Sequence, residues 1–186
     1  MVYVFLATGF EEIEALTPVD LLRRAGVEVK LVKIPSAKDA ADNMIVTGAR
    51  GIMVTCDIKL TEVKADDVEI AILPGGMPGT INLLECKPLM DLIDTLNDQG
   101  KKIAAICAAP AKILGERGML KGRKATCYPG MENLMKGAEF TTESVVTDGN
   151  ITTSRGMGTA MEFGLEMVRL LCGEAVAKDL REGVVA

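Results

Sequence analysis

Short apolar runs alternate with segments of helical periodicity along most of this 186-residue chain. Residues 2–7 and 27–34 are β-rich runs, and between them, in 11–24, apolar residues recur every three or four positions. Gly26 follows the helical segment as a stop signal. Two strands joined by a helix in this way predict a parallel βαβ unit.

The same alternation continues to the C-terminus. After a loop rich in Ala, Asp and Asn, residues 52–55 predict a short strand at a sheet edge or in a hairpin. Further strands are predicted at 68–73, 102–106 and 151–153, and helices at 89–96, 108–116 and 159–171. Gly100 and Gly173 end two of these helices. We therefore expect an α/β sandwich, with a mainly parallel sheet between helices, in one domain over residues 1–186.

Charge and hydropathy exclude several classes of partner. The net charge is −5, and the single basic cluster, at Lys121, Arg123 and Lys124, is typical of a solvated turn, so we expect no specific nucleic acid recognition. No apolar stretch approaches the roughly 18 residues of a membrane span, and residues 2–7 lack the basic flank of a signal peptide. The expectation is a cytoplasmic protein with no membrane association.

The chain has no histidine, and this limits its chemistry more than any other feature of composition. A Ser-His-Asp triad, a Cys-His dyad and a His-ligated zinc site are all excluded within the chain. The cysteines number five and form no C-x-x-C pair, which argues against a disulfide framework or a zinc knuckle. We expect reduced thiols and neither a metal nor a cofactor.

Cys107 is the best candidate for a nucleophile. It lies where a predicted buried strand meets a predicted helix, and the free N–H groups of a helix N-terminus favour a thiolate with a lowered pKa. In parallel sheets, ligands bind beyond the carboxyl ends of the strands, which is where Cys107 falls. The alternative is a strand-end cysteine that only packs in the core.

Two other predicted strand ends carry groups that could assist Cys107. Gly75 and Gly76 follow a strand, and the backbone N–H groups of Gly76 and Ala108 could bind an oxyanion. A tight turn without catalytic duty is the alternative for the two glycines.

The acidic cluster of Glu11, Glu12 and Glu14 follows the first strand. A carboxyl buried beside a thiolate has a raised pKa, stays protonated and can move a proton. The residues alone do not choose among the three, and all three could instead stabilise a helix N-terminus.

Five segments in order, 9–14, 18–26, 73–76, 104–110 and 153–156, resemble the superfamily of the Parkinson-disease protein deglycase, also called ThiJ/PfpI, and within it the deglycase branch. The resemblance runs nearly end to end. It implies a flavodoxin-like fold, a homodimer, and Cys107 as a nucleophile on a strained elbow that oxidises readily to the sulfinate. It also selects Glu14 as the protonated partner of the cysteine.

The resemblance further places Arg24 and Arg50 near the pocket and the dimer interface. The chain also departs from the family pattern: Tyr128 stands where many relatives carry a histidine, which weakens any inference of peptidase activity. Met157 replaces a proline, and Met77 an asparagine, of relatives, so the shape of the pocket differs.

The leading hypothesis is a cofactor-independent enzyme that acts on methylglyoxal-type α-oxoaldehydes or on their early adducts on proteins. Cys107 would add to the aldehyde, Glu14 would move a proton between adjacent carbons, and the N–H groups of Gly76 and Ala108 would hold the oxyanion. The main alternative is a non-catalytic redox sensor or stress chaperone that uses the same cysteine. A different small-molecule hydratase or hydrolase is a third reading.

Overall fold

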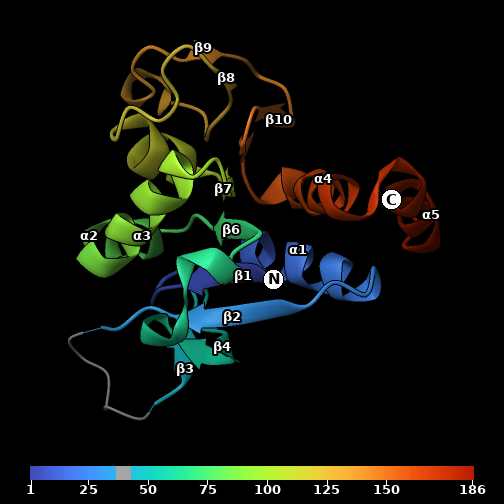
Figure 1. Ribbon diagram of the computed structural model, residues 1–186, viewed down its shortest axis with the longest axis horizontal. Coiled ribbons are helices and arrows are strands. Elements are labelled where there is room, and N and C mark those ends of the chain that lie inside the picture. The colour runs from blue at the N-terminus through green and yellow to red at the C-terminus, as the bar shows by residue number, and fades with distance from the viewer. Residues whose placement is uncertain (37–42) are drawn as a thin grey trace.

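A computed structural model describes residues 1–36 and 43–186. Its centre is a seven-stranded sheet with the order β10-β11-β7-β6-β1-β2-β5 (Figure 1). The strands are β1 (Val2–Leu6), β2 (Val29–Lys33), β5 (Ile58–Lys59), β6 (Ile70–Leu73), β7 (Lys102–Ile106), β10 (Val145–Asp148) and β11 (Ile151–Ser154). All neighbours pair in parallel except β10 and β11, which are antiparallel. The predicted mainly parallel sheet is confirmed.

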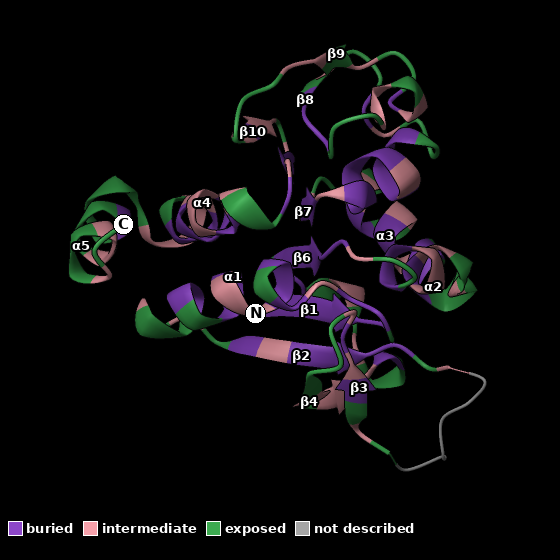
Figure 2. Ribbon diagram, turned by 180° about the vertical axis from the view of Figure 1, so that it is seen from behind, coloured by how far each residue is buried: buried purple, intermediate pink, exposed green. Residues whose placement is uncertain are grey.

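Helices cover both faces of this sheet. On one side lie α1 (Glu12–Arg24), α4 (Ala160–Cys172) and α5 (Glu174–Gly183), and on the other lie α2 (Gly79–Glu85), α3 (Lys87–Asp98) and the π-helical turn η3 (Pro110–Gly115). Each helix layer packs on its own hydrophobic cluster. The central strands β1, β6 and β7 lie between the layers and are almost wholly buried (Figure 2).

The remaining elements are short. β3 (Ile45–Thr47) and β4 (Met53–Thr55) form an antiparallel hairpin, so the hairpin reading of residues 52–55 is confirmed. β8 (Lys124–Ala125) and β9 (Glu139–Phe140) make a second small pair. Four 3₁₀ turns complete the list: η1 (Leu60–Glu62), η2 (Ala65–Asp67), η4 (Glu132–Leu134) and η5 (Met157–Thr159).

The predicted helices and strands lie where the pattern placed them, with shifts of a few residues at their ends. The predicted helix 89–96 is longer as α3, and a second helix, α2, precedes it without having been predicted. The segment after Cys107 is helical as predicted, but most of it is a π-helical turn. Part of the loop predicted after Ile34 falls on residues 37–42, which lie outside the described residues.

The order β7-β6-β1 in the sheet matters for function. Because these three strands are parallel neighbours, the segments that follow them meet at one edge. These segments are the Glu cluster after β1, the glycine pair after β6 and Cys107 after β7.

Over 1–36 and 43–186, no helix combines the length and the apolar character needed to cross a membrane.

Candidate active site

Cys107 directly follows β7 and has a left-handed backbone conformation, with φ of +67°. A residue with a side chain pays on the order of 1–3 kcal/mol for such a conformation, so its surroundings must hold it in place. Its N–H donates to Ser154 O at 3.0 Å, and its carbonyl accepts from Tyr128 N–H at 2.8 Å. These two bonds from neighbouring segments fix the turn that presents the thiol.

The glycine pair after β6 lies directly against Cys107. A Cβ on Gly75 would be 2.6 Å from Cys107 Cβ and 3.0 Å from Sγ, so only glycine allows this approach. Gly76 has φ of +90°, and a Cβ there would be 2.4 Å from Glu11 N. The N–H groups of Gly76 and Ala108 hydrogen-bond the Cys107 sulfur. The two predicted oxyanion donors therefore lie together at the thiol.

Glu14 is the acidic residue that the structure brings to Cys107. Its side chain is only 1% exposed, hydrogen-bonds the Cys107 thiol and accepts from Gly75 N–H at 2.9 Å. The N–H of Met157 also hydrogen-bonds the Glu14 carboxyl. This geometry agrees with the residue that the resemblance selected.

The other two acidic residues have different partners. Glu11 is the N-cap of α1 and accepts from Glu14 N–H at 2.8 Å. Glu12 is buried and accepts from Arg50 N–H at 2.6 Å through Oε1, and its Oε2 finds no hydrogen-bond partner within the described part of the chain. The Glu11 carboxylate thus caps the N-terminus of α1, and Glu14 lies in the first turn of the same helix.

The Glu14 carboxyl binds its proton unusually tightly. Burial raises its pKa from 4.5 to about 7, the hydrogen bond with Cys107 opposes this, and the nearby charge of Glu11 adds to the increase. Near neutral pH the carboxyl therefore exists in both protonation states, which suits a group that must both accept and donate a proton.

The predicted lowering of the Cys107 pKa is wrong. Burial and then the adjacent Glu14 carboxyl raise the pKa of this thiol to about 12, although the N–H groups of Gly76 and Ala108 act in the opposite direction. Burial also raises the pKa of Cys56 and Cys127, so Cys107 does not lie below them. The position of Cys107 at the start of a helix predicted the nearby N–H groups. It did not predict how deeply the thiol is buried or that the Glu14 carboxyl contacts it.

The remaining predicted site residues are distributed differently. Tyr128 lies beside the pair: a Cβ on Gly156 would be 3.4 Å from the Tyr128 ring and 3.9 Å from Glu14 Oε1. Arg50 contacts Glu12 through its backbone, and its guanidinium bonds only Ala49 O among the described residues. Arg24 lies ten residues along α1 from Glu14, about 15 Å along the helix axis, and pairs with Asp20. Within one chain, Arg24 therefore does not join the site.

Sequence reasoning missed the contribution of the segment after β11. Met157 N–H reaches Glu14, and Ser154 O holds Cys107 N–H. The sequence signal that could have shown this was the end of a fourth predicted strand, at residues 153–156, which lies beside β7 in the sheet.

All five cysteines are free, and the described residues contain no group of three or more Cys, Asp and Glu side chains that could hold a metal ion.

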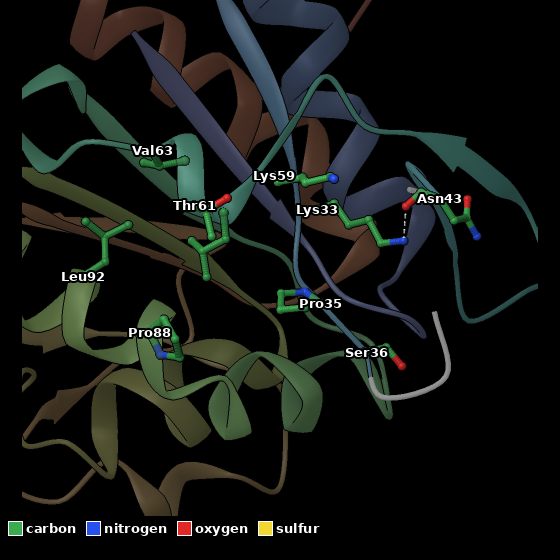
Figure 3. A pocket seen from close by; sticks show the side chains of 10 residues that line it. Lys33, Pro35, Ser36, Asn43, Lys59, Thr61, Val63, Pro88 and Leu92 are labelled. Atoms are coloured by element: carbon green, nitrogen blue, oxygen red, sulfur yellow. Dashed lines mark hydrogen bonds between the residues drawn. The ribbon is translucent and has the colours of Figure 1, made fainter. Parts of the chain in front are cut away.

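One apolar cavity lies away from Cys107 and Glu14. It measures about 380 Å³, and Lys33 at its wall donates to Asn43 O (Figure 3). Its walls come from β2, the β5–η1 segment and α3, and contain neither Cys107 nor Glu14. This cavity therefore contributes none of the groups at the Cys107–Glu14 pair.

The chain is similar to known proteins over most of its length. The model of the DJ-1/PfpI family matches residues 1–170. Oxidized DJ-1 from Toxoplasma gondii has a similar structure, with 34% identity, a TM-score of 0.91, and coverage of 99% of this chain and 97% of that one. A deglycase of Pyrococcus abyssi is 32% identical over 173 residues, covering 91% of this chain and 98% of its own.

Protein DJ-1 homolog B of Arabidopsis thaliana is 38% identical over 181 residues, or 96% of this chain, and the chain spans 40% of that longer relative. Family model, relatives and structure agree over nearly the whole chain. The chain belongs to the DJ-1/PfpI family.

Proposed function

We propose that this protein is a cofactor-independent enzyme that converts α-oxoaldehydes of the methylglyoxal type, free or as early glycation adducts, into hydroxy acids. The observation that carries the proposal is the Cys107 thiol held against the buried Glu14 carboxyl, with the N–H groups of Gly76 and Ala108 on its sulfur. The name deglycase belongs to the Pyrococcus abyssi relative, and its likeness over nearly the full length of both chains supports the same class of chemistry here.

The first step is addition of sulfur to the aldehyde carbon. With a pKa of about 7, Glu14 is partly ionised near neutrality and accepts the thiol proton as the C–S bond forms. This removes the need for a free thiolate, which burial makes unfavourable. The aldehyde oxygen becomes the oxyanion of a hemithioacetal, and the N–H groups of Gly76 and Ala108 stabilise it.

The second step moves hydrogen between two adjacent carbons. Glu14 first passes the thiol proton to the hemithioacetal oxyanion and so becomes a carboxylate again. It then takes the proton from the former aldehyde carbon and delivers it to the neighbouring carbon, while the hydroxyl proton moves to the ketone oxygen. The first carbon is thereby oxidised to a thioester and the ketone is reduced to an alcohol. Water then breaks the C–S bond, releasing the hydroxy acid and the thiol. The sum is oxoaldehyde plus water to hydroxy acid, without an external oxidant or reductant.

The test is production of lactate from methylglyoxal without glutathione. Wild type should form lactate with saturation kinetics, Cys107→Ala none, and Glu14→Gln at least about 100-fold less, as for loss of a general base. Cys172→Ala, which removes a half-buried cysteine on α4, is the matched control. Loss of aldehyde without lactate, equal in all four proteins, would mean simple scavenging by thiols and refute the proposal.

A redox sensor is the second candidate, favoured by the oxidized state of the solved Toxoplasma gondii relative. Here two molecules of peroxide would convert the Cys107 thiol through the sulfenic acid to the sulfinate, releasing two molecules of water. Peptide mass spectrometry after peroxide treatment would show selective sulfinate at Cys107. Selective oxidation together with absent lactate formation would favour the sensor over the enzyme.

We also propose a homodimer, as the family resemblance implies. Three large apolar side chains of the β3–β4 hairpin region, Ile45, Ile52 and Met53, are exposed in the single chain and support burial against a second copy. Light scattering after gel filtration should give twice the chain mass of 19.8 kDa. Met53→Asp should shift the mass toward one chain, and a monomeric wild type would refute the dimer.

A further inference from the structure

Three large apolar side chains are exposed next to the catalytic pair. Met77 is 52% exposed, Tyr128 49% and Met157 58%, and we refer to these three as the apolar rim. Single exposed apolar residues are common on protein surfaces and need no explanation. These three come from separate segments whose backbones all meet at the Cys107–Glu14 pair.

A backbone hydrogen bond joins each rim residue, or the residue next to it in the chain, to the site. Met77 follows Gly76, whose N–H bonds the Cys107 sulfur, and the N–H of Met157 bonds the Glu14 carboxyl. Tyr128 N–H donates to Cys107 O at 2.8 Å. The backbone that carries each rim side chain is therefore held at the site.

We infer that the apolar rim of Met77, Tyr128 and Met157 binds the substituent on the ketone carbon and selects free oxoaldehydes with apolar substituents larger than methyl. The inference rests on the proposed function. A substrate held to Cys107 by its aldehyde carbon must direct the rest of the molecule outward, past the rim. Methionine side chains are flexible and polarisable, so they can pack on substituents of different shape.

The reaction for such a substrate is the same as for methylglyoxal. An alkylglyoxal R–CO–CHO takes up one water molecule and becomes R–CHOH–COOH, with C1 oxidised and C2 reduced. Only R differs along a series of linear alkylglyoxals, and the electronic character of the two carbonyl groups is nearly constant. Differences in kcat/KM then report contacts of R with the protein.

The experiment measures kcat/KM for methyl-, propyl- and pentylglyoxal. Full burial of a methylene group is worth about fourfold, and burial of half its surface about twofold. Pentyl has four more methylene groups than methyl, so for a half-exposed rim we expect a gain of about 16-fold from methyl to pentyl. In the double variant Met77→Ser/Met157→Ser and in Tyr128→Ala, the ratio of kcat/KM between pentyl- and methylglyoxal should fall to about twofold or less.

Val176→Ser is the matched control, because Val176 is a 39% exposed apolar residue on α5 away from the site. It should keep the full gain with chain length. A gain that is absent in wild type, or unchanged in both rim variants, would overturn the inference while leaving the proposed enzyme intact. Absence of Cys107-dependent turnover for all three substrates would instead refute the proposed function.

A second measurement needs no turnover. The products 2-hydroxyheptanoate and lactate differ only in the alkyl chain, and each should slow alkylation of Cys107 by iodoacetamide when bound. We expect the longer acid to protect wild type at about 16-fold lower concentration than lactate, with the difference lost in Met77→Ser/Met157→Ser. Equal protection by both acids in wild type would contradict binding of the chain by the rim.

Discussion

A carboxyl buried beside a thiol holds its proton more tightly in the folded protein than in the unfolded chain. Because burial raises the pKa of Glu14 from 4.5 to about 7, the folded state binds more protons than the unfolded state between these values. The contribution of Glu14 to stability is therefore full below pH 4.5 and is lost as pH rises through 7. The size of this loss is about 3 kcal/mol.

Glu14→Gln removes this dependence, since an amide does not titrate. Relative to wild type, the free energy of unfolding of the variant should increase by about 3 kcal/mol between pH 4 and pH 8. Denaturant titrations across this range measure the difference directly. The exposed Glu182→Gln on α5 is the control and should run parallel to wild type. A constant difference between Glu14→Gln and wild type would contradict a raised pKa.

Glu11 acts on the same proton through its charge. It caps α1 by accepting from Glu14 N–H, and its negative charge raises the pKa of the Glu14 carboxyl. Glu11→Gln keeps an oxygen that can accept this bond but removes the charge. The rising limb of the pH profile of kcat/KM should therefore move to lower pH, by a few tenths of a unit to about one. A limb that shifts equally in Glu182→Gln, or not at all in Glu11→Gln, would contradict this account.

At the scale of elements, the turn after β6 sets the distance between Cys107 and Glu14. A methyl group on Gly75 would lie 2.6 Å from both Cys107 Cβ and Glu14 Oε2. Gly75→Ala should force the turn away from the pair and lower kcat/KM by about 100-fold or more, because a shift of 1 Å is enough for such a loss. Gly183→Ala, where a Cβ meets no atom within 4 Å, should keep full activity. Near-normal activity of Gly75→Ala would show that the close approach is dispensable.

The elements themselves were predictable where the pattern was long enough. The alternation of β1, α1 and β2 and the apolar run of β7 predict the parallel sheet from sequence alone. The β5, β8 and β9 strands, of two residues each, were not predicted, since so few residues carry no periodicity. α2 was missed because it is one short helix directly before α3. The strands β3 and β10 and the C-terminal helix α5 were not predicted either.

The site, like the fold, could be predicted only in part. Residues that end strands, such as Cys107 and Gly75, could be placed at one edge because parallel neighbours bring their ends together. The choice of Glu14 needed the family resemblance, since three glutamates lie within four positions. The thiol pKa was predicted in the wrong direction because burial and the contact with Glu14 depend on the packing of α1 against the turn after β6.

At the scale of the whole molecule, the sheet joins two hydrophobic clusters. Ile103 and Ala105 of β7 face the cluster under α3, and Ala104 and Ile106 face the cluster under α1 and α4. A strand cannot keep one face packed while the other face melts, because alternate residues of the same backbone serve both. We therefore expect the two faces to unfold together as one cooperative unit.

Two buried cysteines provide probes for the two faces. Cys127 belongs to the cluster under α3, and Cys56 to the cluster under α1 and α4. Leu96→Ala on α3 and Leu22→Ala on α1 each remove a fully buried side chain and should cost about 2–5 kcal/mol. If unfolding is cooperative, either substitution should raise the alkylation rates of both cysteines by the same factor, at least about 30-fold.

Val176→Ala, on the exposed side of α5, should leave both rates within about twofold of wild type. Peptide mapping by mass spectrometry distinguishes the two thiols in one sample. An increase confined to Cys127 in Leu96→Ala and to Cys56 in Leu22→Ala would mean that each helix layer opens by itself. The site would then be exposed to independent opening from two sides, since Cys107 follows β7 and Glu14 belongs to α1. Equal factors would instead mean that the catalytic pair separates only when the whole sheet unfolds.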